Sequence, residues 1–138
     1  MHWKVFRSPP GGVLVALWCD GKLLLIQNTY KPYLNVPGGG VKAGESLVEA
    51  AARELAEEVG IRVPGDTLKF VAHFQRERDH IDDGGYVFEC VLEVEPPVRV
   101  DRREVKCGAF LSVGAARQYP LAPVLERYLA DREKRTAP

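Results

Sequence analysis

The chain has 138 residues, a length typical of one domain, so we expect a single domain over residues 1–138. Lysine plus arginine and aspartate plus glutamate each number 19, so the formal net charge is zero and no general attraction to nucleic acid or membranes is expected. No segment has the unbroken apolar length that a membrane span needs, and the first twelve residues lack the apolar run of a signal peptide. We therefore expect a soluble, cytoplasmic protein.

The cysteines do not form a recognisable metal or redox motif. The chain contains Cys19, Cys90 and Cys107, which is an odd number, and no two of them have the close spacing of a zinc knuckle or a redox pair. We expect free, partly buried thiols in a reducing compartment.

The first predicted elements are two strands joined by a tight turn. Residues 13–18 and 22–27 are almost wholly apolar and flank Asp20-Gly21, a dipeptide typical of β-hairpin turns. Because the runs are nearly all apolar, we expect both faces of these strands to be covered. Residues 28–40 follow with two prolines and three glycines, and they predict irregular structure.

A helix is predicted from Glu45 to Val59, because apolar residues recur there with the spacing of one helical face. Gly60 stands where the C-terminus of a helix favours glycine. The apolar stripe consists of Val48, Ala51, Ala52, Leu55 and Val59.

The second half of the chain predicts further strands and a final helix. Residues 68–78 and 85–95 are typical of two longer strands, and residues 107–112 of a short one. Residues 122–135 predict an amphipathic helix. The expected fold class is α/β, or α+β, with a mixed β-sheet between helices on both faces. The residues of the final helix that we expect to face inward are Val124, Leu125, Tyr128 and Leu129.

Three glutamates are crowded on the first predicted helix. Glu54, Glu57 and Glu58 are spaced by three and four residues, which places them on one side, along the border of the apolar stripe. Like charges at this spacing destabilise a helix, and the helix dipole disfavours acids in the last turn. A divalent cation such as Mg²⁺ or Mn²⁺, which prefers oxygen ligands, would remove the conflict. The alternative is an ordinary acidic helix face in solvent.

The residues around this cluster favour the functional interpretation. Residues 37–40, Pro-Gly-Gly-Gly, predict a tight turn without Cβ atoms, where a backbone carbonyl approaches a metal or a phosphate closely. Arg53 lies two helical turns after Glu45. We therefore expect Glu45, and Glu49 midway between the two, to orient Arg53 and to brace the loop against the helix.

These residues resemble the signature of a known family. From Gly39 to Ile61 the chain matches the complete Nudix box, G-x5-E-x7-R-E-U-x-E-E-x-G-U, in which U is a bulky aliphatic residue. No position departs from the pattern, and the order of predicted strands on either side is also similar to that family. The matching residues are Gly39, Glu45, Arg53, Glu54, Leu55, Glu57, Glu58, Gly60 and Ile61.

The resemblance implies a Nudix α/β/α sandwich that hydrolyses a nucleoside diphosphate linked to another moiety, with Mg²⁺ or Mn²⁺ as cofactor. Water would attack phosphorus, and two phosphate-bearing products would leave. The implied catalytic residues are Arg53, Glu54, Glu57 and Glu58. The three glutamates would bind metal, and one of them would act as the base.

Further site residues are implied by the same resemblance. The carbonyl of Gly38 would be another metal ligand, and Gly39, Glu45 and Arg53 would brace the loop–helix unit. Family members often carry one more acidic residue after the later strands. Glu104 is the candidate here for a ligand or base, and its alternative is a surface acid beside two arginines.

The substrate is not selected by the sequence. Patterns typical of family members that act on coenzyme A, ADP-ribose, dinucleoside polyphosphates or oxidised guanine nucleotides are mostly missing, and none of these activities is excluded. The arginines among the candidates would clamp phosphate, and the alternative for all of them is a polar surface loop. The substrate-facing candidates are Lys31, Tyr33, Asn35, Arg76 and Arg78.

Three functions remain open at this point. The leading one is a metal-dependent pyrophosphohydrolase of a small nucleotide, such as a nucleoside triphosphate or a nucleotide sugar. The second is a hydrolase of RNA 5′ ends, which the balanced charge disfavours because an RNA channel usually has a basic stripe. The third is a non-catalytic Nudix-fold sensor, a class that typically loses the box glutamates. The resemblance is also compatible with a homodimer.

Overall fold

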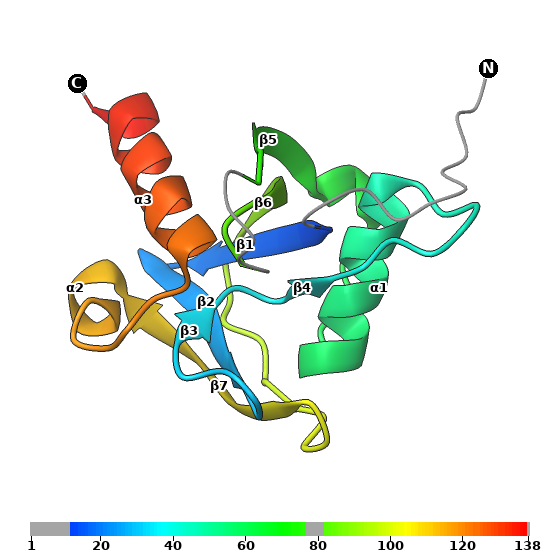
Figure 1. Cartoon of the computed structure of the whole chain (residues 1–138), viewed down its shortest axis with the longest axis horizontal. Helices are drawn as coiled ribbons and strands as arrows, with labels where there is room; N and C mark the ends of the chain where they lie inside the picture. The colour runs from blue at the N-terminus through cyan, green and yellow to red at the C-terminus, as the bar shows by residue number, and fades with distance from the viewer. Residues whose placement is uncertain (1–11, 77–81, 138) are drawn as a thin grey trace.

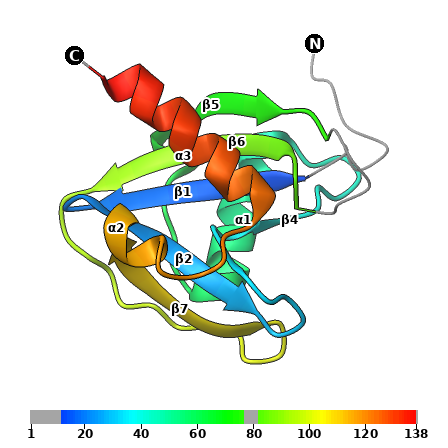
Figure 2. The same cartoon turned by 60° about the vertical axis from the view of Figure 1, so that its left-hand side comes forward.

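The computed structural model describes residues 12–76 and 82–137 of the chain. One mixed β-sheet lies between α1 and α3, which cover its opposite faces (Figure 1, Figure 2). This is the α+β class with helices on both faces that the sequence predicted. In chain order the elements are β1 (Val13–Cys19), β2 (Lys22–Asn28), β3 (Leu34–Asn35), β4 (Gly38–Gly39), α1 (Leu47–Val59), the 3-10 helix η1 (Gly65–Thr67), β5 (Lys69–Phe74), β6 (Gly85–Leu92), β7 (Val105–Ser112), α2 (Val113–Ala116) and α3 (Pro123–Thr136).

The predicted hairpin of β1 and β2 is present, and its arms separate soon after the turn. Asp20 and Gly21 both have positive φ, 51° and 74°, as a tight hairpin turn requires. β1 and β2 pair only next to that turn, and β3 then pairs with β2 while β4 pairs with β1. The prediction of irregular structure over residues 28–40 was therefore incomplete, since residues 34–39 lie between the two arms.

α1 begins two residues later than predicted and ends where predicted. Ser46 caps its N-terminus, because its hydroxyl accepts the N–H of Glu49 while the Glu49 carboxylate accepts the N–H of Ser46. Gly60 has φ 70° and donates its N–H to Ala56 at 3.0 Å, which ends the helix.

The later strands complete the sheet. β5 and β6 are the two predicted longer strands, although both are shorter than expected. They pair antiparallel with each other, and β6 also pairs in parallel with β1. β7 begins at Val105, two residues earlier than predicted, and runs along β2. The short elements η1 and α2 were not predicted, because a single turn of helix is too short to show a period.

Two apolar cores lie on the two faces of the sheet. One packs α1 against alternate residues of β1, including Val13, Val15 and Leu17, and the other packs α3 against Leu14 and Ala16. All residues of β1 are buried, and so are the four inward-facing residues predicted for α3. Within residues 12–76 and 82–137, no helix is both long and apolar enough to cross a membrane. All three cysteines are free thiols as predicted: Cys19 and Cys90 are buried and Cys107 is exposed.

A polar network attaches α3 to the sheet. Trp18 donates its indole N–H to the Tyr128 hydroxyl at 2.8 Å, and that hydroxyl donates to Glu89. Arg132 and Arg135 bind the same carboxylate at 2.9 Å and 3.0 Å. Burial alone would raise the pKa of Glu89, but the hydrogen bonds from Arg135, Tyr128 and Arg132 outweigh it and hold this pKa below its ordinary value.

This network predicts a pH-dependent loss of stability. Replacing Glu89 by glutamine should lower the free energy of unfolding at pH 7 by about 2 kcal/mol, because hydrogen bonds to a charged partner are lost. A lowered pKa stabilises the fold above the ordinary value of 4.5, and the stabilisation disappears as the pH falls through the lowered value. Denaturant titrations of wild type and Glu89→Gln should therefore differ at pH 7 and converge in acid.

The matched control is Glu133→Gln. Glu133 pairs with Arg117 at 2.9 Å, but both side chains are largely exposed, so the change should alter stability little at any pH. An equal effect of the two substitutions at pH 7 would contradict the assigned role of Glu89.

Candidate active site

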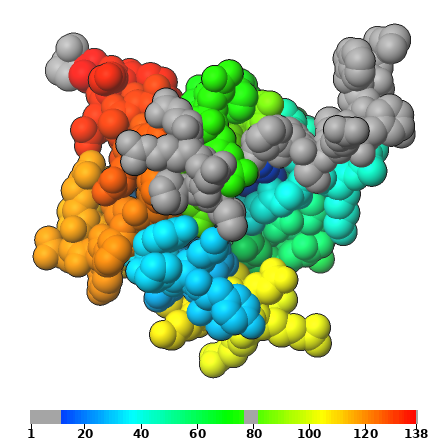
Figure 3. Space-filling model, in the orientation of Figure 1, coloured from blue at the N-terminus to red at the C-terminus, as the bar shows by residue number. Residues whose placement is uncertain are grey.

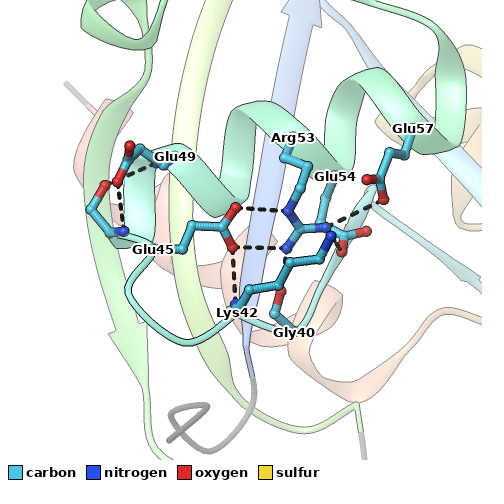
Figure 4. Close-up of polar contacts among 8 residues, drawn as sticks. Gly40, Lys42, Glu45, Glu49, Arg53, Glu54 and Glu57 are labelled. Carbon is cyan, nitrogen blue, oxygen red and sulfur yellow. Dashed lines mark hydrogen bonds and ion pairs between the residues drawn. The ribbon is translucent and has the colours of Figure 1, made fainter. Parts of the chain in front are cut away.

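Arg53 is the hub of the loop–helix unit. Its Nε and Nη2 donate to the two oxygens of Glu45 at 2.7 Å and 2.9 Å, and Nη2 also donates to the carbonyl of Gly40 at 2.8 Å (Figure 4). The hydrogen bonds to Glu45 raise the pKa of Arg53, and those from Arg53 lower the pKa of Glu45. Both groups therefore stay charged at neutral pH, and they join α1 to the loop that precedes it.

The same guanidinium contacts two of the three clustered glutamates. Its Nη1 donates to Glu54 at 2.7 Å and to Glu57 at 3.3 Å. The Glu57 side chain is 55% exposed, whereas Glu54 is mostly covered. Burial raises the pKa of Glu54, although the hydrogen bond and charge of Arg53 oppose this. Arg53 thus offsets part of the repulsion within the cluster.

Glu58 is the buried member of the cluster, only 6% exposed. Its Oε1 accepts the backbone N–H of Gly38 at 2.7 Å, which ties the end of α1 to the glycine turn. Burial raises the pKa of Glu58 to about 8, and the charges of Glu54 and Glu104 add to the effect. The sequence had placed all three glutamates along the border of the apolar stripe, but the structure gives them three different degrees of burial.

Gly39 faces the Glu54 carboxylate directly. A Cβ atom at this position would lie 2.6 Å from the carboxyl carbon of Glu54 and 2.7 Å from both of its oxygens. No side chain fits there unless that carboxylate moves. The absence of a Cβ at Gly39 therefore allows the glycine turn and the helix to approach this closely.

Glu104 lies on the other side of the cluster, in the connection before β7. It lines a hollow together with Glu57, Glu58 and Asp101. Backbone hydrogen bonds hold this connection in place: Asp101 donates to the carbonyl of Glu58 at 3.2 Å, and the carbonyl of Glu104 accepts from Thr29 at 2.8 Å. The space-filling view shows residues near 100, in yellow, beside residues near 30, in light blue (Figure 3). Sequence reasoning missed Asp101, since the Nudix pattern assigns no role to its position.

The donor set fits a hard divalent cation. The side chains that meet here are carboxylates, the ligand type that Mg²⁺ and Mn²⁺ prefer, and Glu58 is a buried acid whose charge a cation would stabilise. Among the described residues no three His, Cys, Asp or Glu side chains are gathered around one point. Glu54 and Glu57 turn toward Arg53 instead. A cation at this cluster would therefore compete with Arg53 for Glu54 and Glu57.

The substrate-facing candidates lie on a neighbouring hollow. Asn35 and Arg76 line it together with Asp82 and the glycine turn, residues 38–40. Two other candidates, Lys31 and Tyr33, contact the Asp82 carboxylate. The remaining candidate, Arg78, lies outside the described residues.

The sheet between two helices, with a glycine turn hydrogen-bonded to a glutamate-bearing helix, defines a fold of the α/β/α sandwich type. A family model of the NUDIX domain matches residues 9–131, which is most of the chain. The chain belongs to the Nudix hydrolase family, as the box predicted.

Known proteins resemble the chain to different extents. An uncharacterised Nudix hydrolase of Bacillus subtilis, YvcI, is 31% identical over 108 residues, which cover 78% of this chain and 68% of that protein. Phosphatase NudJ of Escherichia coli K12 is 47% identical over 56 residues, or 39% of this chain and 37% of NudJ. The Nudix domain of Shewanella oneidensis NrtR, solved with ADP ribose, shares the fold with a TM-score of 0.74 and 20% identity over 90% of this chain and 86% of that one.

Close packing at Gly39 predicts that a side chain there lowers activity but leaves the stability of the fold nearly unchanged. In Gly39→Ala the new methyl group should displace the flexible Glu54 carboxylate rather than the backbone. We expect hydrolysis to fall about 100-fold, because displacement of a catalytic group by an ångström is enough for such a loss. The melting temperature should change little. Gly114→Ala is the control, since a Cβ at Gly114 meets no atom within 4 Å, and it should retain full activity.

The bidentate contact of Arg53 with Glu45 predicts that lysine cannot replace this arginine. A lysine ammonium is a point charge that cannot bind both oxygens of Glu45 and the Gly40 carbonyl in the same planar arrangement. Arg53→Lys should lower the free energy of unfolding by about 1 to 2 kcal/mol and reduce activity, as measured by denaturant titration and by product release. The same change at exposed Arg62 should have neither effect. Wild-type stability and activity in Arg53→Lys would show that the bracing contact is dispensable.

Proposed function

We propose that the protein is a metal-dependent pyrophosphohydrolase that cleaves a nucleoside diphosphate linked to another moiety. The observation that carries the proposal is the Arg53-centred unit, in which Glu45, Glu54, Glu57 and the glycine turn are joined around one guanidinium. The Nudix hydrolase membership supports the reaction type. The name of NudJ, a phosphatase, and the ADP ribose bound to the NrtR domain support a phosphate-bearing substrate of nucleotide size.

The cation would be held by the cluster at the end of α1. The proposed ligands are the side chains of Glu54, Glu57, Glu58 and Glu104 and the carbonyl of Gly38. When bound, Mg²⁺ or Mn²⁺ would neutralise the charge of the pyrophosphate and make water a stronger acid. Glu58 contacts the glycine turn directly through the N–H of Gly38, so the ligands from the helix and the turn are joined before any substrate binds.

In the proposed reaction a carboxylate would accept a proton, and Arg53 would position the carboxylates. The oxygen of a water molecule attacks phosphorus, the bond from phosphorus to the bridging oxygen breaks, and the bridging oxygen leaves with its electron pair on the second phosphate. One of the clustered carboxylates accepts the proton that the water loses. Arg53, held by Glu45, keeps these carboxylates beside the glycine turn. Two phosphate-bearing products result.

Two other functions remain as outcomes of the test. Hydrolysis of RNA 5′ ends would need an extended basic surface, and the chain carries no excess of basic residues. A non-catalytic sensor would not need the intact box glutamates that this chain has. The proposed partner is therefore a small nucleotide-type substrate. The homodimer, the single-domain organisation and the cytoplasmic location stay predictions.

The proposed function is tested by phosphate release from a panel of nucleotides and nucleotide sugars, with Mg²⁺ and with Mn²⁺. We expect turnover by wild type that depends on the cation and falls about 100-fold or more in Glu57→Gln and Glu58→Gln. Glu49→Gln is the matched control, because Glu49 serves the helix cap and glutamine preserves a capping box. It should keep wild-type activity.

The alternatives give different results in the same experiment. No phosphate release from any small substrate, together with hydrolysis of 5′-triphosphate RNA, would support the RNA activity. Nucleotide binding without turnover at any substrate would support a sensor. Either result would overturn the proposed function.

A further inference from the structure

Asp82 lies outside the cluster of Glu54, Glu57 and Glu58. It lines the hollow that also contains the glycine turn, residues 38–40, together with Asn28, Asn35 and Arg76. The clustered glutamates follow the glycine turn on α1, whereas Asp82 enters the hollow from the connection between β5 and β6. A ligand whose phosphates lie at the glycine turn would therefore extend its remaining part toward Asp82.

The carboxylate of Asp82 is fixed by neighbours on two sides. Its Oδ2 accepts the hydroxyl of Tyr33 and lies 3.4 Å from the Lys31 ammonium. Its backbone carbonyl accepts the N–H of Val124 at 2.8 Å, so the first turn of α3 holds the main chain. Next to it, Arg127 donates to the carbonyls of Gln75 and Asp83 and so joins the two ends of the same connection. Asp82 is therefore positioned before a ligand binds.

One oxygen of this carboxylate remains available. Within residues 12–76 and 82–137, the polar contacts of Asp82 are made by Oδ2 and by the backbone carbonyl, and its side chain is 20% exposed. Burial and the hydrogen bond to Asp82 raise the pKa of Tyr33, so the Tyr33 hydroxyl keeps its proton and serves as a donor to Oδ2. Oδ1 is left as an acceptor on a residue that lines the hollow.

The chemistry of an acceptor-only group restricts what it selects. A carboxylate repels phosphate and receives hydrogen bonds from hydroxyl or N–H groups. Lys31 offsets part of its charge, which lowers the repulsion toward an anionic substrate without removing the acceptor. The group that Asp82 selects is thus a neutral hydrogen-bond donor beyond the phosphates, on a sugar or on a base.

We propose that Asp82 is a specificity-determining residue, which accepts a hydrogen bond from a hydroxyl or N–H group on the nucleoside part of the substrate. The inference rests on the proposed function for the direction in which the substrate lies. Asp82 lies outside the Nudix box. The substrate class that it would select is nucleotides whose nucleoside part places a hydrogen-bond donor next to it.

The test measures equilibrium binding and turnover with pairs of nucleotides that differ in one donor. Binding of AMP, GMP, CMP and UMP is compared with that of their 2′-deoxy forms, and GMP with IMP, which lacks the amino group. The ribose pairs and the GMP–IMP pair separate a sugar donor from a base donor. We expect wild type to prefer the donor-bearing member of one pair by about 10-fold.

Variants at Asp82 should remove that preference. In Asp82→Ala and Asp82→Asn the ratio for the selected pair should fall below about 2-fold, with a higher KM for the donor-bearing substrate and an unchanged kcat. A residue that only supported the fold would lower kcat for both members and would leave their ratio intact. Asp66→Asn, at an exposed position in η1, is the control and should keep the wild-type ratio.

The outcomes separate this inference from the proposed function. Discrimination in binding that is lost in the Asp82 variants supports the inference even where no turnover is found, and it would then describe a sensor. Turnover with equal ratios in wild type and Asp82→Ala overturns the inference and leaves the hydrolase intact. Absence of nucleotide binding to wild type overturns the inference as well.

Discussion

The pairing of the Arg53 guanidinium with the Glu45 carboxylate is the interaction on which the site depends. Glu45 precedes α1 and Arg53 lies two turns into it, so their two hydrogen bonds fold the preceding loop back along the helix. The remaining donors of Arg53 reach Gly40, Glu54 and Glu57. A single planar cation therefore gathers acidic side chains and a backbone carbonyl that would otherwise separate. Lysine has neither the reach nor the geometry for this set of contacts.

Burial differentiates the glutamates that the cluster brings together. Glu57 is mostly in solvent, Glu54 is covered by Gly39 and Arg53, and Glu58 is almost fully enclosed. Each group consequently has a different electrostatic environment, although the three are nearly adjacent in sequence. In the proposed metal site, the enclosed members would hold a cation away from bulk water, while one member would remain accessible to a water molecule. Glu57 and Glu58 line a hollow together with Asp101 and Glu104, which lie in the connection before β7.

The sequence predicted the features that depend on local periodicity or on a complete motif. The hairpin around Asp20-Gly21, the extent of α1 up to Gly60, the inward face of α3 and the Nudix membership were all obtained from it. It missed β3 and β4, because two-residue strands show no period and arise only where the arms of β1 and β2 part. The burial of Glu58 was missed because a helical wheel places a residue relative to its own helix, whereas the glycine turn that covers it comes from outside. The places of Asp82 and Asp101 beside the two hollows were also missed. Backbone hydrogen bonds to residues distant in sequence hold both, and the sequence has no signal for such contacts.

The separation of β1 and β2 has a consequence for how such a site can evolve. Gly38 and Gly39 pair with β1, and the carbonyl of Pro37 accepts the N–H of Val15 at 2.8 Å, so the turn that faces the glutamates is itself part of the sheet. The turn is therefore held by the paired strands, and a change in its length would disturb its pairing with β1 and that of β3 with β2. β5, by contrast, is the edge strand of the sheet. A change in chain length should therefore be tolerated better next to this edge strand than in the turn that contacts the glutamates.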